Sequence, residues 1–267
     1  MSWIDAVFLA LVQGVTEFLP VSSSAHLILP SQLFGMQDQG LAFDVAVHFG
    51  TLFAVCLYYR RQLVELLMGN IHMLKEGKTN GSAKLAWLIV AATIPAGLAG
   101  IIFGDVIEQQ LRSMIVIAST TILFGLLLGF ADKTREGDKT EQSLCIKDAL
   151  IIGFAQAMAL IPGTSRSGVT MTAALFLGYK RHDAASISFL LSIPIIAAAA
   201  LLKTVELIQA DRVVDFQNLL IGITVSFLFA YFTIALFLKL LSRLGFMPFV
   251  VYRLLLGAAL FAVVFFS

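Results

Sequence analysis

Long apolar stretches separated by short polar ones dominate the chain. Six of them are long enough to cross a lipid bilayer as helices, at about residues 41–60, 84–103, 112–131, 184–203, 216–239 and 247–266. Pro95 and Pro194 fall inside two of these stretches, which a spanning helix tolerates because neighbouring helices satisfy the freed backbone groups. The pattern therefore predicts an all-α integral membrane protein with six transmembrane helices.

Two further apolar stretches are too short to span. Residues 4–19 end at Pro20 and residues 148–161 end at Pro162, and after each proline a Ser-containing segment leads into another short apolar run. At about 1.5 Å of rise per residue, neither half of such a hairpin crosses a bilayer. The sequence therefore predicts two re-entrant helix pairs, which dip into the membrane and return on the same side.

The two predicted hairpins resemble each other. Asp5-Ala begins the first and Asp148-Ala the second, and Gln13 and Gln156 follow at the same interval. Chance similarity between apolar segments is the alternative explanation. Each hairpin is followed by three spans, an odd number, so the two halves have opposite orientations. We expect a single membrane domain, 1–267, made of inverted-topology repeats at about 1–131 and 144–267.

Charge and composition support this reading. The chain is 59% hydrophobic and 13% charged, and most of its basic residues fall in the loops on one side of the predicted topology, which is then the cytoplasmic side. Both termini face outward, and the tips of the two hairpins meet near the midplane. The net charge of +1, without a long basic run, argues against a nucleic-acid partner.

Polar and ionisable residues cluster at the two hairpin tips, where they are costly and hence candidates for function. In the first tip, Gln13 and Glu17 share one helix face. The other polar residues of the two tips are Ser22, Ser23, Ser24 and His26 in the first hairpin, and Thr164, Ser165, Arg166, Ser167 and Thr170 in the second. Asp44 and His48, spaced i, i+4 in the span at 41–60, receive no assigned role.

This cluster is suited to a phosphate. Each hairpin resumes as a helix whose N-terminus, with hydroxyl residues near it, attracts anions, and Arg166 adds a guanidinium fork for bidentate phosphate contact. The Glu17 carboxylate would repel an anion unless a divalent cation lay between them. His26 could serve as an acid, a base or a nucleophile on phosphorus.

Plainer roles are also open for these residues. The hydroxyl groups of Ser22, Ser24, Thr164 and Thr170 could simply cap the interrupted helices. Arg166 could form a structural ion pair with Glu17 across the repeat interface, and His26 alone could be a hydrogen-bonded core histidine.

Two segments resemble a known family. The segments Gln13-Gly-Val-Thr-Glu17-Phe-Leu-Pro-Val-Ser-Ser-Ser-Ala-His26 and Pro162-Gly-Thr-Ser-Arg-Ser-Gly168 are similar to the two signatures of the bacterial undecaprenyl-diphosphate phosphatases, also called bacitracin-resistance proteins. The resemblance runs the whole length of the chain. In that family the first signature has Glu or Gln followed, after three residues, by Glu, so Gln13 is a permitted variant with one carboxylate fewer.

The resemblance implies hydrolysis of undecaprenyl diphosphate to undecaprenyl phosphate, the lipid carrier of cell-wall synthesis. It implies that Glu17 with Gln13 holds Mg²⁺ or Ca²⁺, that Ser23 and His26 carry the attack, and that phosphate binding falls to Ser165, Arg166, Ser167 and Thr170. By the same resemblance, the protein lies in the bacterial inner membrane with its site facing the periplasm. The attacking group, whether Ser23, His26 or water, stays open, and a homodimer is compatible with the sequence.

Three other classes of protein have to be compared with this assignment. The other large class of lipid phosphatases needs a histidine soon after its Ser-Arg pair, but the next one here is His182, so we exclude that class. A lipid-phosphate flippase or transporter is the serious rival, because inverted repeats with broken helices are a common transporter design. Glu17, Ser23 and His26 on one short turn favour the enzyme, and this buried cluster argues against a purely structural protein.

Overall fold

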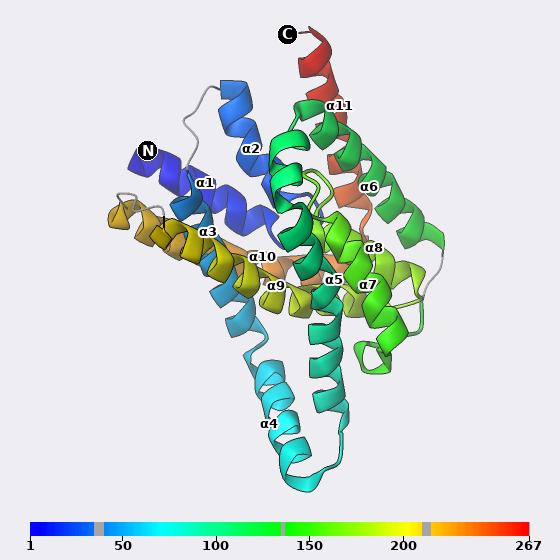
Figure 1. Ribbon diagram of the computed structural model, residues 1–267. Coiled ribbons are helices and arrows are strands. Elements are labelled where there is room, and N and C mark those ends of the chain that lie inside the picture. Colours follow the sequence, from blue (N-terminus) through cyan, green and yellow to red (C-terminus); the bar gives the residue numbers. More distant parts are fainter. Residues whose placement is uncertain (35–39, 135–136, 210–214, 267) are drawn as a thin grey trace.

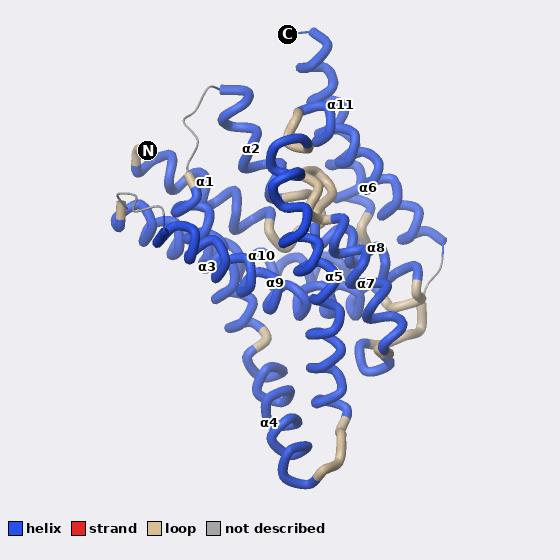
Figure 2. Tube along the Cα trace, in the orientation of Figure 1, coloured by secondary structure: helices blue, strands red, loops and turns tan. Residues whose placement is uncertain are grey.

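The computed structural model describes residues 1–34, 40–134, 137–209 and 215–266, and its elements are helices joined by short loops (Figures 1 and 2). The helices are α1 (Trp3–Thr16), α2 (Ser23–Phe34), α3 (Leu41–Tyr58), α4 (Arg60–Glu76), α5 (Gly81–Gln110), α6 (Met114–Thr134), α7 (Ile146–Met158), α8 (Arg166–Phe176), α9 (Arg181–Gln209), α10 (Phe216–Leu244) and α11 (Met247–Phe266), with a 3₁₀ turn, η1 (Glu141–Ser143), before α7.

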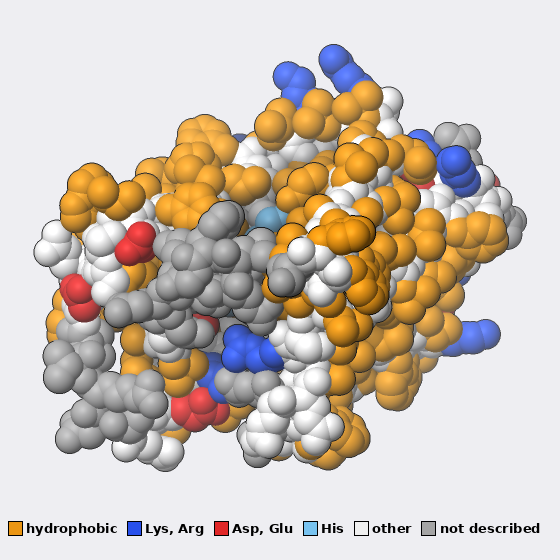
Figure 3. All heavy atoms as spheres, turned by 90° about the horizontal axis from the view of Figure 1, so that it is seen from above, with side chains coloured by type: hydrophobic (Ala, Val, Ile, Leu, Met, Phe, Trp, Pro, Cys, Tyr) orange, Lys and Arg blue, Asp and Glu red, His pale blue; other side chains and the backbone are white. Residues whose placement is uncertain are grey.

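Six of the described helices are long and apolar enough to cross a membrane, and they are the six predicted from the sequence. They are α3, α5, α6, α9, α10 and α11. The last three spans begin close to their expected positions, but α9 and α10 each run for 29 residues, more than the roughly 20 that a bilayer requires. Hydrophobic side chains cover large continuous areas of the described surface in Figure 3, as contact with lipid requires. The chain is therefore a multi-pass membrane protein.

The two predicted interruptions are present. α1 and α2 have 14 and 12 residues, and the chain between them turns through residues 17–22. α7 and α8 have 13 and 11 residues and are separated by residues 159–165. At about 1.5 Å per residue, each of these four helices is shorter than the hydrocarbon core of a bilayer.

The two halves of the chain pack by exchanging helices. α1 of the first half lies against α10 of the second, and α7 of the second half lies against α5 of the first. α3 packs on both α9 and α10, and α6 lies beside α11. Both short helices approach their partners closely through a glycine: a Cβ at Gly14 would lie 2.7 Å from the carbonyl oxygen of Ser226, and one at Gly153 would meet the backbone of Ala92. The interrupted ends of α1 and α7 are thereby brought into the centre of the bundle (Figure 1).

The sequence did not predict α4. This helix and the start of α5 form a hairpin that projects from the bundle (Figure 1). Its composition is too polar for a span, because residues such as Arg60, Glu65 and Lys75 alternate with apolar ones. The search for continuous apolar stretches therefore treated it as part of a connection.

Candidate active site

The carboxylate of Glu17 lies at the centre of the polar cluster. Glu17 is the C-terminal cap of α1, and its side chain is 6% exposed. Its Oε2 accepts hydrogen bonds from Gln13 Nε2 at 2.9 Å and from Ser23 Oγ at 2.7 Å. Its Oε1 accepts one from Arg166 Nη2 at 3.0 Å, which is also a salt bridge. One carboxylate thus joins the two hairpins.

The backbone at the two breaks explains this convergence. Among the described residues other than glycine, Ser22 and Ser165 have positive φ angles, of 74° and 73°. They are separated by the same interval as Gln13 and Gln156, and each directly precedes the first residue of a resuming helix. This conformation costs a non-glycine residue about 1 kcal/mol or more and persists only where the surroundings enforce it. The residues that follow, Ser23 and Arg166, are the two that reach the Glu17 carboxylate from the resuming helices.

The second tip is tied to the first by a chain of hydroxyl groups. Ser165 caps α8, since its Oγ accepts from the Gly168 N–H at 3.1 Å. The Ser165 and Ser167 hydroxyls are 3.2 Å apart, and Ser167 Oγ donates to the carbonyl of Leu19 at 2.8 Å. Ser167 therefore links the two breaks directly, while Ser165, which the sequence assigned to phosphate binding, satisfies a free helix N–H.

The remaining hydroxyl residues have separate surroundings. Thr170 donates to Ser188 Oγ at 2.7 Å, so its side chain is directed to α9 rather than to Glu17. Ser22 and Ser24 have hydroxyls 3.2 Å apart. Thr164 is fully buried, and within the described ranges its hydroxyl has no hydrogen-bond partner.

Arg253 of α11 holds both breaks in place, and sequence reasoning missed it. Its guanidinium is fully buried. It donates to the carbonyl of Pro20 at 3.2 Å in the first break and to those of Gly163 at 2.8 Å and Thr164 at 3.0 Å in the second. Further bonds reach the carbonyl of Thr121 at 3.0 Å and that of Thr120 in α6. An arginine within an otherwise apolar span was the available signal.

The turn before α8 also depends on a glycine. Gly163 has a φ of 89°, and a Cβ there would clash with the Thr120 side chain and the Ile117 carbonyl. Thr120 Oγ1 donates to the carbonyl of Pro162 at 2.7 Å. α6 therefore braces the second break from one side, while Arg253 braces it from another.

His26 is held between its own helix and α11. Its Nδ1 lies 2.7 Å from the carbonyl of Ser22, so Nδ1 carries the proton and donates. In the neutral ring Nε2 is then the acceptor, and the Tyr252 hydroxyl donates to it at 2.5 Å. His26 and Ser23 are spaced i, i+3 on α2, one turn apart. Tyr252 is a second residue of the cluster that sequence reasoning did not single out.

Asp44 and His48, the last polar pair noted in the sequence, both lie on α3. His48 Nδ1 lies 2.7 Å from the Asp44 carbonyl, which is a contact within the helix itself. The His48 imidazole also interacts electrostatically with the Glu17 carboxylate, so this pair stands beside the site.

The first tip fits a hard divalent cation. Gln13 is fully buried, and its Oε1 has no hydrogen-bond partner among the described residues, while its Nε2 orients the Glu17 carboxylate. An amide oxygen and a carboxylate are oxygen ligands that Mg²⁺ and Ca²⁺ accept. In the described ranges no group of three or more His, Cys, Asp or Glu side chains could hold a metal. Water and substrate phosphate would complete the coordination, which is the usual arrangement for Mg²⁺.

Fold and site together define a multi-pass helical membrane protein with a buried site made of a carboxylate, an arginine, hydroxyls and helix N-termini. Residues 6–259 match the family model described as bacitracin resistance protein BacA, and the chain belongs to this family.

Curated relatives agree over the full length. The chain is 54% identical over 267 residues, covering 100% of both chains, to a protein of Saccharophagus degradans named undecaprenyl-diphosphatase. It is 55% identical over 260 residues to proteins of the same name from Hahella chejuensis, with 97% of each chain covered, and from Alcanivorax borkumensis, with 97% of this chain and 98% of the other covered.

Proposed function

We propose that this chain is an undecaprenyl-diphosphate phosphatase, a phosphoric anhydride hydrolase that releases inorganic phosphate and leaves undecaprenyl phosphate in the membrane. The observation that carries the proposal is the Glu17 carboxylate, which receives the Ser23 hydroxyl on one oxygen and the Arg166 guanidinium on the other. The relatives named above carry the same activity in their names.

Substrate binding begins with an exchange of partners at Arg166. A diphosphate carries more negative charge than the Glu17 carboxylate and offers a bidentate match to the guanidinium fork. Arg166 therefore turns toward the terminal phosphate, and its Nη1, which now donates to the Ser188 carbonyl at 3.3 Å, keeps the arginine anchored on α9. Oε1 of Glu17 is thereby freed, while Oε2 keeps the hydrogen bond from the Ser23 hydroxyl and can accept its proton.

The first chemical step is attack by Ser23. Its Oγ forms a bond to the terminal phosphorus while the bond from that phosphorus to the bridging oxygen breaks, and the hydroxyl proton passes to Glu17 Oε2, 2.7 Å away. The electron pair stays on the departing undecaprenyl phosphate. Arg166 and the free N–H groups at the start of α8 stabilise the charge on the transferring phosphoryl group.

The second step restores the serine. Water attacks the phosphoserine, its proton goes to Nε2 of His26, and the Ser23 oxygen takes back the proton held by Glu17 as inorganic phosphate leaves. The Tyr252 hydroxyl, which donates to that Nε2 in this structure, moves aside for this step. His26 then releases the proton to water, and the Tyr252 hydroxyl returns to the neutral ring.

Gln13 and Glu17 are the residues that would hold Mg²⁺ or Ca²⁺. Bound there, the cation would neutralise charge on the diphosphate and so allow a carboxylate and two phosphates to share one site. Ser165 and Ser167 keep the second tip in position for the phosphate, and Thr170 holds α8 against α9 through its hydrogen bond to Ser188 Oγ at 2.7 Å.

The finer architecture supports the same function. We propose that α1–α2 and α7–α8 are re-entrant pairs of inverted repeats at about 1–131 and 144–267. Two observations support this. α1 packs on α10 and α7 packs on α5, so each short helix lies against the other half of the chain. Ser22 and Ser165 also have the same backbone conformation at the two breaks. In the bacterial inner membrane, with the site open to the periplasm, the enzyme would recycle the lipid carrier for peptidoglycan synthesis and confer bacitracin resistance by consuming the antibiotic's target lipid.

Phosphate release from undecaprenyl diphosphate by the detergent-purified protein, with and without Mg²⁺, tests the proposal. We expect metal-dependent release that is lost in Arg166→Ala. A folded wild-type protein that binds the lipid but releases no phosphate with either Mg²⁺ or Ca²⁺ would contradict it and favour the lipid-phosphate flippase built on the same repeat.

A further inference from the structure

α4 carries apolar side chains on a side that no other described helix covers. Five of them form a stripe, here named the α4 stripe, and are 42% to 81% exposed: Val64, Leu67, Met68, Ile71 and Leu74. They follow one another at i, i+3, i+4, i+7 and i+10, which places them on one face of the helix. A different face packs on α5, since a Cβ at Gly69 would lie 2.9 Å from the backbone nitrogen of Ala83. An exposed apolar stripe of this size indicates a partner outside the described fold.

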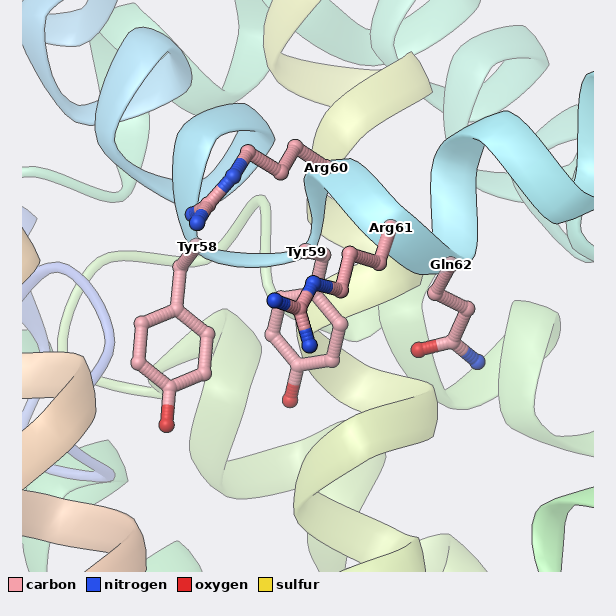
Figure 4. A pocket seen from close by; sticks show the side chains of 5 residues that line it. All are labelled: Tyr58, Tyr59, Arg60, Arg61 and Gln62. Atoms are coloured by element: carbon pink, nitrogen blue, oxygen red, sulfur yellow. The ribbon is translucent and has the colours of Figure 1, made fainter.

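α4 begins where a membrane span ends. α3 is a span that ends at Tyr58, and Tyr59, with a φ of −90° and a ψ of 14°, interrupts the helix before α4 starts at Arg60. Figure 4 shows this junction, where Arg60 and Arg61 follow the two tyrosines directly. Tyrosines followed by basic residues are typical of the cytoplasmic end of a span. α4 therefore starts at the membrane surface on the basic side, and its hairpin with α5 leaves the bundle there (Figure 1).

Basic side chains border the α4 stripe. The hairpin of residues 60–84 has five basic residues, all exposed, and two acidic ones: Arg60, Arg61, Lys75, Lys78 and Lys84 against Glu65 and Glu76. Arg60 lies four residues before the first member of the stripe and Lys75 four residues after Ile71, so both share its face. Glu65 and Glu76, spaced i, i+11, lie together on a different face. Positive charge thus stands at both ends of the stripe.

This arrangement favours a lipid leaflet over a second copy of the chain as the partner. If two copies met stripe to stripe about a twofold axis, a basic end of one stripe would face a basic end of the other, whichever way the helices ran. The like charges would then repel. The phosphates of anionic lipids instead complement both ends, while the acyl chains beneath them accept the apolar side chains.

We propose that α4 is an interfacial helix, which lies along an anionic lipid leaflet on the basic side of the membrane. The α4 stripe enters the upper acyl chains, and Arg60 and Lys75 bind lipid phosphates at its two ends. The proposal accounts for a helix that follows a span directly but is too polar to be one. It does not depend on the activity proposed for the hairpin tips.

Spin labels on the full-length protein, reconstituted into phosphatidylcholine–phosphatidylglycerol vesicles, test this placement. The two free cysteines are first replaced, in Cys56→Ala/Cys145→Ala, and one label is attached at Leu67→Cys on the α4 stripe or at His72→Cys on the face of the acidic residues. The readout is the ratio of collisions with oxygen, which concentrates in lipid, to collisions with a water-soluble nickel chelate. We expect this ratio to be about threefold higher or more for Leu67→Cys than for His72→Cys.

A second arm varies the charge of the lipid. Raising phosphatidylglycerol from none to half of the lipid should raise the ratio for Leu67→Cys by about twofold, and Arg60→Gln/Lys75→Gln should abolish that rise. The matched control Lys239→Gln/Arg243→Gln removes two exposed basic residues near the end of α10 and should keep the rise. Unchanged thermal unfolding establishes that the variants are folded.

Three results would overturn the proposal. Equal ratios for the two labels at every lipid composition would place α4 in water. A ratio for Leu67→Cys that does not respond to phosphatidylglycerol would remove the anionic lipid as the partner. Spin–spin broadening at Leu67→Cys, with little access for either collision partner, would mean that a second copy of the chain covers the stripe.

Discussion

Nη2 of Arg166 lies 3.0 Å from Oε1 of Glu17, across a sequence separation of 149 residues. Each residue stands at the break of a different hairpin, and both side chains are largely buried. A buried pair of this kind is weak evidence for stability, because the cost of removing two charges from water offsets much of their attraction. In the mechanism proposed above its value is functional, because an arriving phosphate would compete for the arginine and leave the carboxylate beside Ser23.

Gln13→Glu tests the cation site. Two carboxylates would then lie where Nε2 of Gln13 now donates to Glu17, so without metal the variant should unfold at a lower temperature than the wild type. Mg²⁺ should raise its unfolding temperature more than that of the wild type and lower the metal concentration for half-maximal activity by about tenfold. Thermal unfolding with and without Mg²⁺ measures this. Equal metal responses would place the cation elsewhere.

Arg253 should be a major contributor to stability. Arg253→Met leaves the carbonyls of Pro20 and Thr164 without the guanidinium donor and that of Gly163 with only the Thr121 hydroxyl at 3.4 Å, and we expect the Tm in detergent to fall by about 10 °C, as a loss of several kcal/mol implies. Arg253→Lys keeps the positive charge but has fewer hydrogen-bond donors, so its Tm should lie between those of the wild type and Arg253→Met. Arg243→Met on the exposed end of α10 is the matched control. A wild-type Tm in Arg253→Met would mean that other contacts hold the breaks.

His26 and Tyr252 should act as a unit. Tyr252→Phe removes the contact that orients the His26 ring between turnovers, so Nε2 is less often directed at the attacking water, and we expect kcat to fall by about tenfold with little change in KM. The same substitution in a His26→Gln background should cost little more, because the partner is already gone. Steady-state phosphate release for the two single variants and the double variant measures the coupling. Effects that multiply would show that the two residues work independently.

Asp148, at the start of α7, should make stability depend on pH. Burial alone would raise the pKa of this carboxyl, but hydrogen bonds from Lys139 Nζ and the Tyr179 hydroxyl, each at 2.8 Å, hold its pKa below the ordinary value. Because the folded-state pKa is the lower one, the stabilisation is present above the ordinary carboxyl pKa and is lost as pH falls through the folded value. Asp148→Asn should therefore flatten the acid side of a plot of Tm against pH. An unchanged slope would rule this carboxyl out as its source.

Much of the fold was predictable because lipid imposes a simple rule on sequence. Continuous apolar length identified all six spans, and proline followed by serine identified both breaks. The same rule missed α4, whose polar residues hide a helix from a search for apolar runs. The sequence also did not predict that α9 and α10 are longer than a bilayer requires, because nothing in their composition marks where the bilayer ends.

The candidate site was predictable only at the level of residue types. Glu17, Ser23 and Arg166 were singled out because polar groups are costly at membrane depth, but which atoms meet depends on backbone turns at Ser22 and Ser165 that no pattern reveals. Arg253 and Tyr252 were overlooked because they lie in a clean apolar span, far in sequence from either signature. Only packing against α6 and α2 brings them to the breaks.

The most direct measurement of the central claim is a double-mutant cycle on phosphate release from undecaprenyl diphosphate with Glu17→Gln, Arg166→Gln and the double variant, all checked for native thermal unfolding. If the two hairpins form one catalytic site, each single substitution should lower kcat/KM by about 1000-fold, and the double variant should be scarcely slower than either. Folded single variants that keep most of the wild-type rate, or single effects that multiply fully in the double variant, would contradict the account.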